Sequence, residues 1–368
     1  MTSRDRSVDE LSNATAPLID GYDVVMFDLD GVLYLGEDPV AHAAEGAERV
    51  RAAGSSIAFV TNNASRTPEQ VAAQLSDLGI PAEAADVVTS AQAAARLVAA
   101  QVPAGAAVLV VGGVGLEAAL AEHGLRAVRS LSHEPAAVIQ GFSSDVAYAH
   151  LAEAGYAVAA GLPWVVSNTD MTIPTARGIA PGNGTLVAAV AAAGGQQPQV
   201  AGKPEPPLFD ETVLRIGGHR PLVVGDRLDT DIEGANRVGT DSLLVLTGVT
   251  DPSALCNAEP LRRPTFVAPD LRGLTASQPF VTAVERRDAD SEQGWHCEGW
   301  QAVVTSAGRL EVAPAQASGA ARSRAPRSGD STIALLRAPV AAAWAWRDGQ
   351  PTAPDVDTAA LAAALLDR

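Results

Sequence analysis

Short apolar runs alternate with stretches of helical character along the first three quarters of the chain. The apolar runs lie at residues 24–27, 57–60, 108–111, 222–224 and 242–246. Continuous runs of this length are typical of parallel strands that are buried on both faces of a sheet. The stretches that favour helices lie at residues 40–53, 68–78, 90–100, 115–123, 145–154 and 184–193. Strands and helices in alternation predict an α/β fold with a parallel sheet.

This alternation ends near residue 278, and the rest of the chain has a different pattern. It predicts a hairpin and two helices, at residues 300–305 with 310–313, at 332–345 and at 356–367. Residues 313–329 are rich in Ser, Ala, Pro and Arg, which is typical of a flexible loop or linker. Residues 278–368 are therefore predicted to form a small α+β appendage.

The appendage holds four of the five Trp residues, Trp295, Trp300, Trp344 and Trp346. Aromatic side chains dominate protein cores and interfaces. We expect these residues to form the core of the appendage or to dock it, either on the rest of the chain or on a second subunit. The second alternative would make the protein a homodimer.

Composition and charge narrow the class of protein. The 368 residues suffice for two or three domains and for a large core. The net charge of −17 argues against binding a nucleic-acid backbone, and an aromatic content of 4% argues against a surface that stacks nucleobases. The longest Ala-rich stretch is far shorter than the roughly 20 apolar residues of a membrane span, and the first residues lack the apolar segment of a secretory signal. The prediction is a soluble, cytoplasmic protein without nucleic-acid or membrane partners.

The first candidate site follows the first apolar run, where Asp28, Asp30 and Gly31 stand in the sequence DLDG. Parallel sheets place their sites at the carboxyl ends of the strands, and the alternation of side chains points both carboxylates to one side. Two acids this close repel each other unless a cation lies between them or one is protonated. The pair indicates a metal site, an acid beside a nucleophile, or both, with a simple turn or the start of a calcium loop as the alternative.

Two further candidates suit an anion. Thr61, Asn62 and Asn63 follow the run at 57–60, and a hydroxyl with loop amides suits a phosphoryl oxygen, although the same residue types favour turns and helix N-caps. Lys203 stands between a Gly and a Pro and offers a fixed positive charge, although a lone loop Lys is usually solvated.

The last candidate follows the apolar run at 222–224, in the sequence GDRLDTD. Asp226, Asp229 and Asp231 place three acids within six positions. Carboxylate oxygens in such a group suit a hard divalent cation, and solvated loop acids are the alternative.

The order of these motifs along the chain resembles the haloacid dehalogenase superfamily of phosphatases. The resemblance is greatest to the branch with a large α/β cap, which holds phosphoglycolate, glycerol 3-phosphate, pyridoxal-phosphate and nitrophenyl-phosphate phosphatases and the nucleotide phosphatase NagD. It extends over about residues 20–275 and leaves the appendage without a counterpart. The matching segments are DLDGVLYLG (28–36), VTNNASR (60–66), SNTD (167–170), PGNGTL (181–186) and GDRLDTDI (225–232).

The resemblance implies a domain organisation. A Rossmann-like core would comprise residues 1–84 and 196–277, and an inserted α/β cap would comprise residues 85–195. The appendage, residues 278–368, would follow as a third part of unknown role.

The resemblance also implies a mechanism in which Asp28 attacks phosphorus to form an aspartyl-phosphate and Asp30 acts as general acid and base. Mg²⁺ would be bound by Asp28, the backbone carbonyl of Asp30 and Asp226, with Asp231 in a supporting position. Thr61, Lys203 and the loop residues Gly31, Asn62 and Asn63 would bind the phosphate.

The resemblance leaves the substrate open among small phosphorylated metabolites. Asn168 and Asp170 are the candidate cap residues for substrate selection, and a structural turn is the alternative for both. Ser143 and Ser144 stand where members of the branch often carry Asp-Arg. Glycerol 3-phosphate is the preferred candidate, ahead of 2-phosphoglycolate, pyridoxal phosphate and nucleoside monophosphates. A phospho-accepting signalling module is the rival from another class, although such modules are much shorter.

Overall fold

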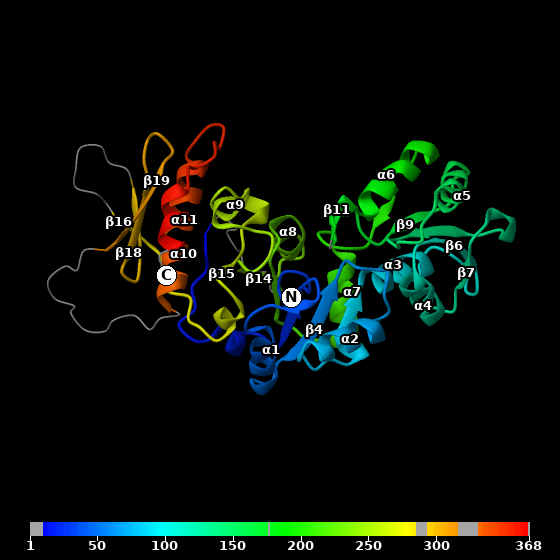
Figure 1. Ribbon diagram of the computed structural model, residues 1–368, viewed down its shortest axis with the longest axis horizontal. Helices are drawn as coiled ribbons and strands as arrows, with labels where there is room; N and C mark the ends of the chain where they lie inside the picture. Colours follow the sequence, from blue (N-terminus) through cyan, green and yellow to red (C-terminus); the bar gives the residue numbers. More distant parts are fainter. Residues whose placement is uncertain (1–9, 176, 285–292, 316–329, 367–368) are drawn as a thin grey trace. The chain divides into compact units, whose positions relative to one another are not determined.

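The computed structural model describes residues 10–175, 177–284, 293–315 and 330–366 (Figure 1). The chain forms two compact units. Unit 1 contains residues 1–35, 39–57 and 219–368, and unit 2 contains residues 36–38 and 58–218. The division into core, cap and appendage that the sequence suggests stays a prediction. Most of the predicted linker, 316–329, lies outside the described residues.

Unit 1 contains four neighbouring parallel strands. Their order is β15 (Phe266–Ala268), β14 (Asp241–Val245), β13 (Pro221–Gly225) and β1 (Val24–Phe27). The strands predicted at 24–27, 222–224 and 242–246 are confirmed. The register pairs Phe27 with Val224, so β1 and β13 end side by side at one edge of the sheet. The polar residues that follow these two strands therefore leave the sheet at neighbouring points.

Short helices and strands precede, separate and follow these four strands along the chain. They are η1 (Leu18–Gly21), β2 (Tyr34–Leu35), β3 (Asp38–Pro39), α1 (Ala43–Ala52), η4 (Leu228–Ile232), α8 (Glu233–Arg237), α9 (Pro252–Cys256), η5 (Pro260–Arg262) and η6 (Leu271–Leu274). Helix α1 buries Ala43, Ala47 and Val50, which recur at helical spacing. It also buries Gly46, where an added Cβ would lie 2.9 Å from the Leu271 Cβ atom, so the small residue permits close packing.

Unit 2 contains a five-stranded parallel sheet. Its order is β12 (Gln199–Val200), β9 (Trp164–Val166), β8 (Ala137–Gln140), β6 (Ala107–Val111) and β7 (Arg126–Val128). The chain passes from β6 to β7 on one side and then returns to β8 on the other side of β6. The carboxyl ends of β6 and β8 thus form a switch point of the kind at which open α/β sheets bind ligands.

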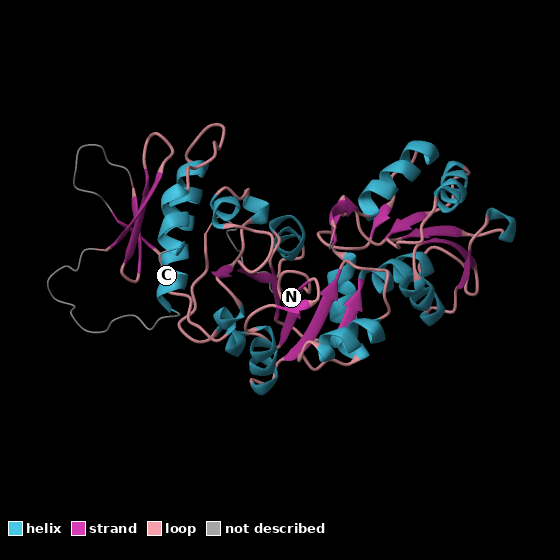
Figure 2. Cartoon of the chain, viewed as in Figure 1, coloured by secondary structure: helices cyan, strands magenta, loops and turns pink. Residues whose placement is uncertain are grey.

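Helices cover both faces of this sheet (Figure 2). Helices α5 (Tyr148–Ala159) and α6 (Asn183–Gly194) pack on one face, where Val158 and Val187 join Leu109 and Val138 in one apolar cluster. The remaining elements of unit 2 are β4 (Ser56–Thr61), α2 (Pro68–Asp77), η2 (Ala84–Asp86), β5 (Val87–Thr89), α3 (Ser90–Ala99), α4 (Val114–Glu122), η3 (Leu131–His133), β10 (Thr172–Thr175), β11 (Gly178–Pro181) and α7 (Pro207–Ile216).

Most predicted helices are confirmed, but the helix predicted at 145–154 is displaced. Helix α5 begins at Tyr148, because Ala147 is extended and the Asp145 amide donates to the Ser143 hydroxyl in a turn. It continues to Ala159 because Ala157 and Val158 extend its buried face. The sequence did not predict the ten-residue helix α7, whose buried face includes the charged residue Glu211. It also did not predict three-residue strands such as β9, since so few residues carry no detectable periodicity.

The appendage forms a four-stranded antiparallel sheet with two helices. The strands are β16 (Thr282–Val284), β17 (Gly294–Cys297), β18 (Trp300–Val304) and β19 (Leu310–Pro314), and the helices are α10 (Asp330–Asp348) and α11 (Ala359–Leu366). Helix α10 lies against this sheet (Figure 1). The predicted hairpin and both predicted helices are confirmed, whereas β16 and β17 were not predicted.

The appendage docks on the parallel-sheet part of unit 1, which confirms the first of the two docking alternatives. Trp344 of α10 is 1% exposed and shares one apolar cluster with Leu255 and Cys256 of α9 and Val267 of β15. The Arg263 guanidinium lies 5.1 Å from the centre of the Trp344 ring, a favourable cation–π distance. Trp295, Trp300 and Trp346 pack against the same cluster.

A buried arginine joins the appendage to the start of the described chain. Arg337 donates hydrogen bonds to the Ser12 carbonyl at 2.8 Å, the Gln278 side chain at 2.8 Å and the Pro279 carbonyl at 2.9 Å. Burial lowers the pKa of Arg337 to about 10. The guanidinium therefore stays charged near neutral pH and ties three distant segments together.

Within the described part of the chain, every helix is too short or too polar to pass through a lipid bilayer.

Replacing Trp344 with Ala tests how much the docked appendage stabilises unit 1. Loss of this buried indole is expected to lower the free energy of unfolding by about 3–5 kcal/mol, measured by urea denaturation. Leu214→Ala is the control, because Leu214 is 65% exposed and its loss should change stability by no more than about 0.5 kcal/mol. Equal midpoints for the two variants would contradict the docked arrangement.

Candidate functional site

Three carboxylates converge in unit 1. Asp28 follows β1, Asp226 follows β13 and Asp231 lies in η4, and one oxygen of each lies within 4.8 Å of the other two. Asp226 and Asp231 are fully buried, and Asp28 is half-buried. The Asp28 amide donates to the Val224 carbonyl at 2.9 Å, so the pairing of β1 with β13 continues into the site.

Close backbone contacts hold Asp226 in place. The Val249 amide donates to its Oδ2 atom at 2.6 Å. A Cβ added to Gly31 would lie 2.5 Å from this oxygen, and one added to Gly248 would lie 2.0 Å from it. Gly31 also has φ +86°, a conformation that favours glycine. The two glycines thus leave the space that the Asp226 carboxylate occupies.

Asp231 approaches the site through a similar contact. Its Oδ2 atom accepts a hydrogen bond from the Arg227 amide at 3.1 Å, and a Cβ on Gly225 would lie only 2.2 Å from the Asp231 Cβ. The middle acid of the motif, Asp229, instead pairs with the Arg227 guanidinium at 2.9 Å. Burial raises the pKa of the Asp229 carboxyl, but hydrogen bonds from Arg227 outweigh that effect and hold the pKa below its ordinary value.

The three convergent carboxylates fit a divalent cation. Carboxylates held this close and largely buried repel one another in a medium of low dielectric constant. A hard cation such as Mg²⁺ or Ca²⁺ prefers oxygen ligands and relieves this repulsion. Among the described His, Cys, Asp and Glu residues, no other group of three or more has this spacing. Asp30 is exposed and its carboxylate is not a member of the group.

In unit 2, the side-chain amide of Asn62 makes two hydrogen bonds to the backbone of Lys203, one through its oxygen and one through its nitrogen. The Lys203 amide donates to Asn62 Oδ1 at 2.8 Å, and Asn62 Nδ2 donates to the Lys203 carbonyl at 3.0 Å. A Cβ on Gly202 would lie 2.5 Å from Asn62 Oδ1, so this contact requires a glycine before the lysine. The Lys203 side chain is 4% exposed, and its Nζ donates to the Val60 carbonyl at 3.3 Å.

A ring of polar side chains holds Asn62 in turn. The Asn62 carbonyl accepts from the Ser90 hydroxyl at 2.6 Å and from Asn168 Nδ2 at 2.7 Å. Asn62 Nδ2 also donates to Asp170 Oδ2 at 3.3 Å, and the Asp170 amide donates to Asn168 Oδ1 at 3.1 Å. Asn168 and Asp170 thus build a turn that supports the Asn62 loop.

The loop after Thr61 is closed by short-range hydrogen bonds. The Asn63 amide donates to Thr61 Oγ1 at 3.1 Å, and the Ser65 amide and hydroxyl donate to Asn63 Oδ1 at 2.8 and 2.7 Å. The Asn63 side chain therefore shapes this loop.

The helix after the Lys203 loop is anchored by a buried ion-pair network. Glu211 of α7 is fully buried and pairs with Arg96 of α3 and Arg215 of α7. Burial raises the pKa of the Glu211 carboxyl, but the hydrogen bonds from the two arginines outweigh that effect and hold the pKa below its ordinary value. Arg215 continues the network to Glu122 of α4 at 2.7 Å.

A cavity of about 480 Å³ opens at the switch point of the unit 2 sheet. Its polar lining comes from Ser65, Arg129, Ser143, Ser144, Asp145 and His150. The Arg129 guanidinium donates to the carbonyls of Val110 and Gly112 at 3.0 Å each, which fixes it at the end of β6. Ser65 brings the cavity next to the loop that follows Thr61.

Two family models match the chain. A model described as haloacid dehalogenase-like hydrolase matches residues 25–126, and a related hydrolase-like model matches residues 200–274. The D-glycerol 3-phosphate phosphatase of Mycobacterium tuberculosis is 46% identical over 284 residues, which are 77% of this chain and 78% of that protein. The chain is a haloacid dehalogenase-like hydrolase.

Solved structures of relatives have the same fold as this hydrolase, which supports the family assignment. A glycerol phosphate phosphatase from M. tuberculosis in complex with magnesium has a TM-score of 0.76 at 41% identity, over 89% of this chain and 92% of that one. The corresponding calcium complex has a TM-score of 0.79 at 40% identity, over 96% and 98%. A thermostable double-mutant NPPase from Geobacillus stearothermophilus has a TM-score of 0.62 at 34% identity, over 68% and 96%.

These coverages correct the expectation that the appendage of this hydrolase has no counterpart in its relatives. The calcium complex leaves only 4% of the 368 residues unmatched, about 15 residues, so most of the appendage has a counterpart there. The sequence motifs did not reveal this counterpart because they all lie before residue 278.

The structure of the hydrolase brings most of the predicted site residues into two groups. Asp28, Asp226 and Asp231 converge in unit 1, and Thr61, Asn62, Asn63, Asn168, Asp170 and Lys203 lie in linked loops of unit 2. The predictions omitted Thr247, Gly248 and Val249, which follow β14 and contact Gly31 and Asp226. Their position just after the strand β14 could have identified them as site residues. They also omitted Ser90, which follows β5.

Replacing Gly248 with Ala tests whether the carboxylate group of the hydrolase binds a cation. The added Cβ would displace the Asp226 carboxylate, so Mg²⁺ affinity measured by calorimetry is expected to fall about tenfold or more. Gly21→Ala is the control, because its Cβ would meet its nearest atom at 3.8 Å. Equal affinity for Mg²⁺ in both variants would contradict the assignment of Asp226 as a ligand.

Proposed function

We propose that this hydrolase is a Mg²⁺-dependent phosphatase of small phosphomonoesters, and that it releases glycerol and phosphate from glycerol 3-phosphate. The observation that carries the proposal is the convergence of Asp28, Asp226 and Asp231. It occurs in a chain that is 46% identical to a D-glycerol 3-phosphate phosphatase. The magnesium complex of the mycobacterial relative supports the choice of cation.

The acids of unit 1 carry the covalent chemistry in this mechanism. An Asp28 oxygen attacks phosphorus and forms an aspartyl-phosphate while the bond from phosphorus to the glycerol oxygen breaks. Asp30 gives its proton to the leaving alkoxide and then takes a proton from the water that hydrolyses the aspartyl-phosphate. The exposure of Asp30, outside the carboxylate group, supports a role in exchanging protons.

Asp28, Asp226 and the Asp30 backbone carbonyl would hold the cation, which supplies charge neutralisation when bound. Asp231 orients this group from its buried position beside Gly225. The acids of unit 1 would otherwise repel a phosphate dianion, so the protein needs a local source of positive charge.

The loops of unit 2 bind and orient the phosphoryl group. Thr61 and the amide of Asn62 donate to phosphoryl oxygens, and Lys203 neutralises their charge. Asn63, whose amide donates to Thr61 Oγ1, shapes this phosphate-binding loop, and Gly31 of unit 1 leaves room for the Asp226 carboxylate. The hydrogen bonds that Asn62 makes to the Lys203 backbone support a fixed position for this lysine. Asn168 and Asp170 act through Asn62 in this scheme.

The cavity of unit 2 is the proposed place of the leaving group. Its volume of about 480 Å³ lies in the range of small-molecule sites. Its hydroxyl-rich lining at Ser143 and Ser144 suits the hydroxyls of a small polyol, since each hydroxyl both donates and accepts. A pyridine ring or nucleobase would gain more from several large stacked aromatic side chains, and Phe142 is the one large aromatic ring among the residues that line this cavity, beside the smaller imidazole of His150.

The cellular location and the oligomeric state of the protein are two further proposals. We place the phosphatase in the cytoplasm, where its small phosphorylated substrate would be available. A homodimer is a second proposal, which does not depend on the appendage because that segment docks on its own chain. The molar mass in solution, measured by light scattering, decides between a dimer and a monomer.

Asp28→Asn tests the chemistry directly. The amide keeps the size of the side chain but is a poor nucleophile, so phosphate release from glycerol 3-phosphate with Mg²⁺ should fall at least about a thousandfold. Chelation by EDTA should abolish the activity of the unaltered protein, and added Mg²⁺ should restore it. Asp20→Asn, an exposed acid in η1, is the matched control. Full activity of Asp28→Asn would refute the mechanism, and stable phosphorylation of Asp28 without turnover would favour a signalling module.

A substrate panel with Ser143→Ala and Ser144→Ala tests the leaving-group cavity. Loss of a hydrogen bond to a glycerol hydroxyl should lower kcat/KM for glycerol 3-phosphate roughly threefold to tenfold. Activity on p-nitrophenyl phosphate, whose leaving group lacks such hydroxyls, should change little. Ser132→Ala, exposed in η3, is the control. A higher kcat/KM for 2-phosphoglycolate, pyridoxal phosphate or a nucleoside monophosphate would replace glycerol 3-phosphate as the preferred substrate.

A further inference from the structure

A four-residue loop lies between the carboxylate group and the docked appendage. Thr247 Oγ1 donates to the Gly31 carbonyl at 2.6 Å. The Val249 amide donates to Asp226 Oδ2 at 2.6 Å, and the Thr250 amide donates to the Asp226 carbonyl at 3.2 Å. The loop 247–250 therefore contacts both the side chain and the backbone of a proposed cation ligand.

The loop passes directly into helix α9. Asp251 caps this helix by accepting a hydrogen bond from the Ala254 amide at 2.7 Å. Leu255 and Cys256 at the other end are fully buried in the apolar cluster that the appendage shares. Because the cap residue Asp251 directly follows Thr250, the loop and α9 are consecutive in the chain, and a shift of α9 would move the end of the loop.

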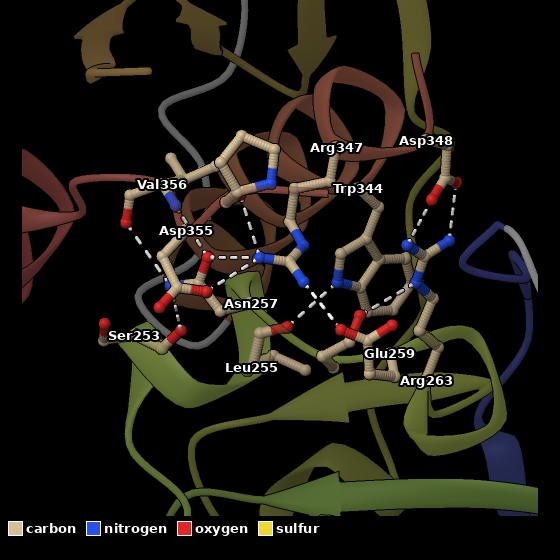
Figure 3. A network of polar contacts seen from close by, with 12 residues as sticks. Ser253, Leu255, Asn257, Glu259, Arg263, Trp344, Arg347, Asp348, Asp355 and Val356 are labelled. Carbon is tan, nitrogen blue, oxygen red and sulfur yellow. Dashed lines mark hydrogen bonds and ion pairs between the residues drawn. The ribbon is translucent and has the colours of Figure 1, made fainter. Parts of the chain in front are cut away.

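The appendage binds the carboxyl end of α9 through α10 (Figure 3). Trp344 Nε1 donates to the Leu255 carbonyl at 2.9 Å. Arg347 Nη1 donates to Asn257 Oδ1 at 3.2 Å, and Arg347 Nη2 donates to Glu259 at 2.9 Å. The Arg347 side chain is only 3% exposed, whereas its partner Glu259 is exposed, so the guanidinium itself is buried at this contact.

Asn257 completes this attachment. Its Oδ1 also accepts from the Val356 amide at 2.7 Å, and its Nδ2 donates to the carbonyls of Ser253 at 3.0 Å and Val356 at 3.3 Å. One side chain thus joins α9 to the segment after α10. We call the contacts of Trp344, Arg347 and Asn257 the α9 latch.

We propose that the α9 latch positions the loop 247–250, and through it Asp226, so that the appendage is a positioning element of the cation site. Trp344, Arg347 and Asn257 are positioning residues, because none of them contacts Asp28, Asp226 or Asp231 in the hydrogen bonds above. The effect on cation affinity rests on the proposed function, which makes Asp226 a ligand. The effect of the latch on the position of the loop does not depend on the proposed function.

Two variants test the latch with the full chain. Arg347→Met removes the bonds to Asn257 and Glu259, together with those to the Pro354 carbonyl and Asp355. Trp344→Phe leaves the bonds of Arg347 in place and keeps an aromatic ring beside Arg263, but removes the bond to Leu255. Hydrogen exchange at the Val249 and Thr250 amides is expected to speed up about threefold to tenfold in each, and Mg²⁺ affinity by calorimetry is expected to fall by a similar factor. Arg309→Met is the control, because the Arg309–Asp357 pair lies in the same appendage, is exposed and is not one of the latch contacts of Trp344, Arg347 and Asn257.

Thermal unfolding separates positioning from mere stabilisation. A lower midpoint with unchanged exchange at Val249 and Thr250 would overturn the proposal, as would equal effects of Arg309→Met. Failure of the proposed function has another signature. If Asp226→Asn binds Mg²⁺ as tightly as the unaltered protein does, Asp226 is not a ligand, and faster exchange at the two amides would still support the latch.

Discussion

The repulsion among three largely buried carboxylates is the constraint that the loops at the ends of β1, β13 and β14 must satisfy. Asp28, Asp226 and Asp231 are brought within 4.8 Å of one another by the parallel pairing of β1 with β13 and by the turn of η4. Such a group is unfavourable unless backbone donors and a cation compensate its charge. The surrounding features serve this need, including the Val249 amide and the glycines that admit the Asp226 carboxylate.

Unit 2 holds a buried lysine in a fixed position. Lys203 is 4% exposed, and the Asn62 side chain fixes its backbone by two hydrogen bonds. Ser90 and Asn168 then fix Asn62. A lysine held this firmly loses little conformational freedom when it binds a ligand, which favours tight positioning over adaptability.

The appendage contacts the helix that follows the Asp226 loop. Its helix α10 buries Trp344 against α9 and places Arg347 on the residues that follow α9. Because α9 continues directly from the loop that holds Asp226, stability and site geometry share one set of contacts. This connection also gives a physical reason for a chain to retain some 90 residues beyond the motifs of its family.

The strand ends, and the polar residues placed there, follow from the amino-acid sequence alone. Apolar runs at 24–27 and 222–224 followed at once by Asp28 and Asp226 predict two acids at one sheet edge, because parallel strands end together. The sequence also indicated the family, through the order of its motifs. Only the tertiary structure decided that Asp229 pairs with Arg227, that Asn62 binds Lys203 across 141 positions, and that Trp344 lies on α9. Contacts between distant residues depend on packing and hydrogen-bond geometry that no local pattern records, whereas strand ends follow from the local pattern of apolar and polar residues.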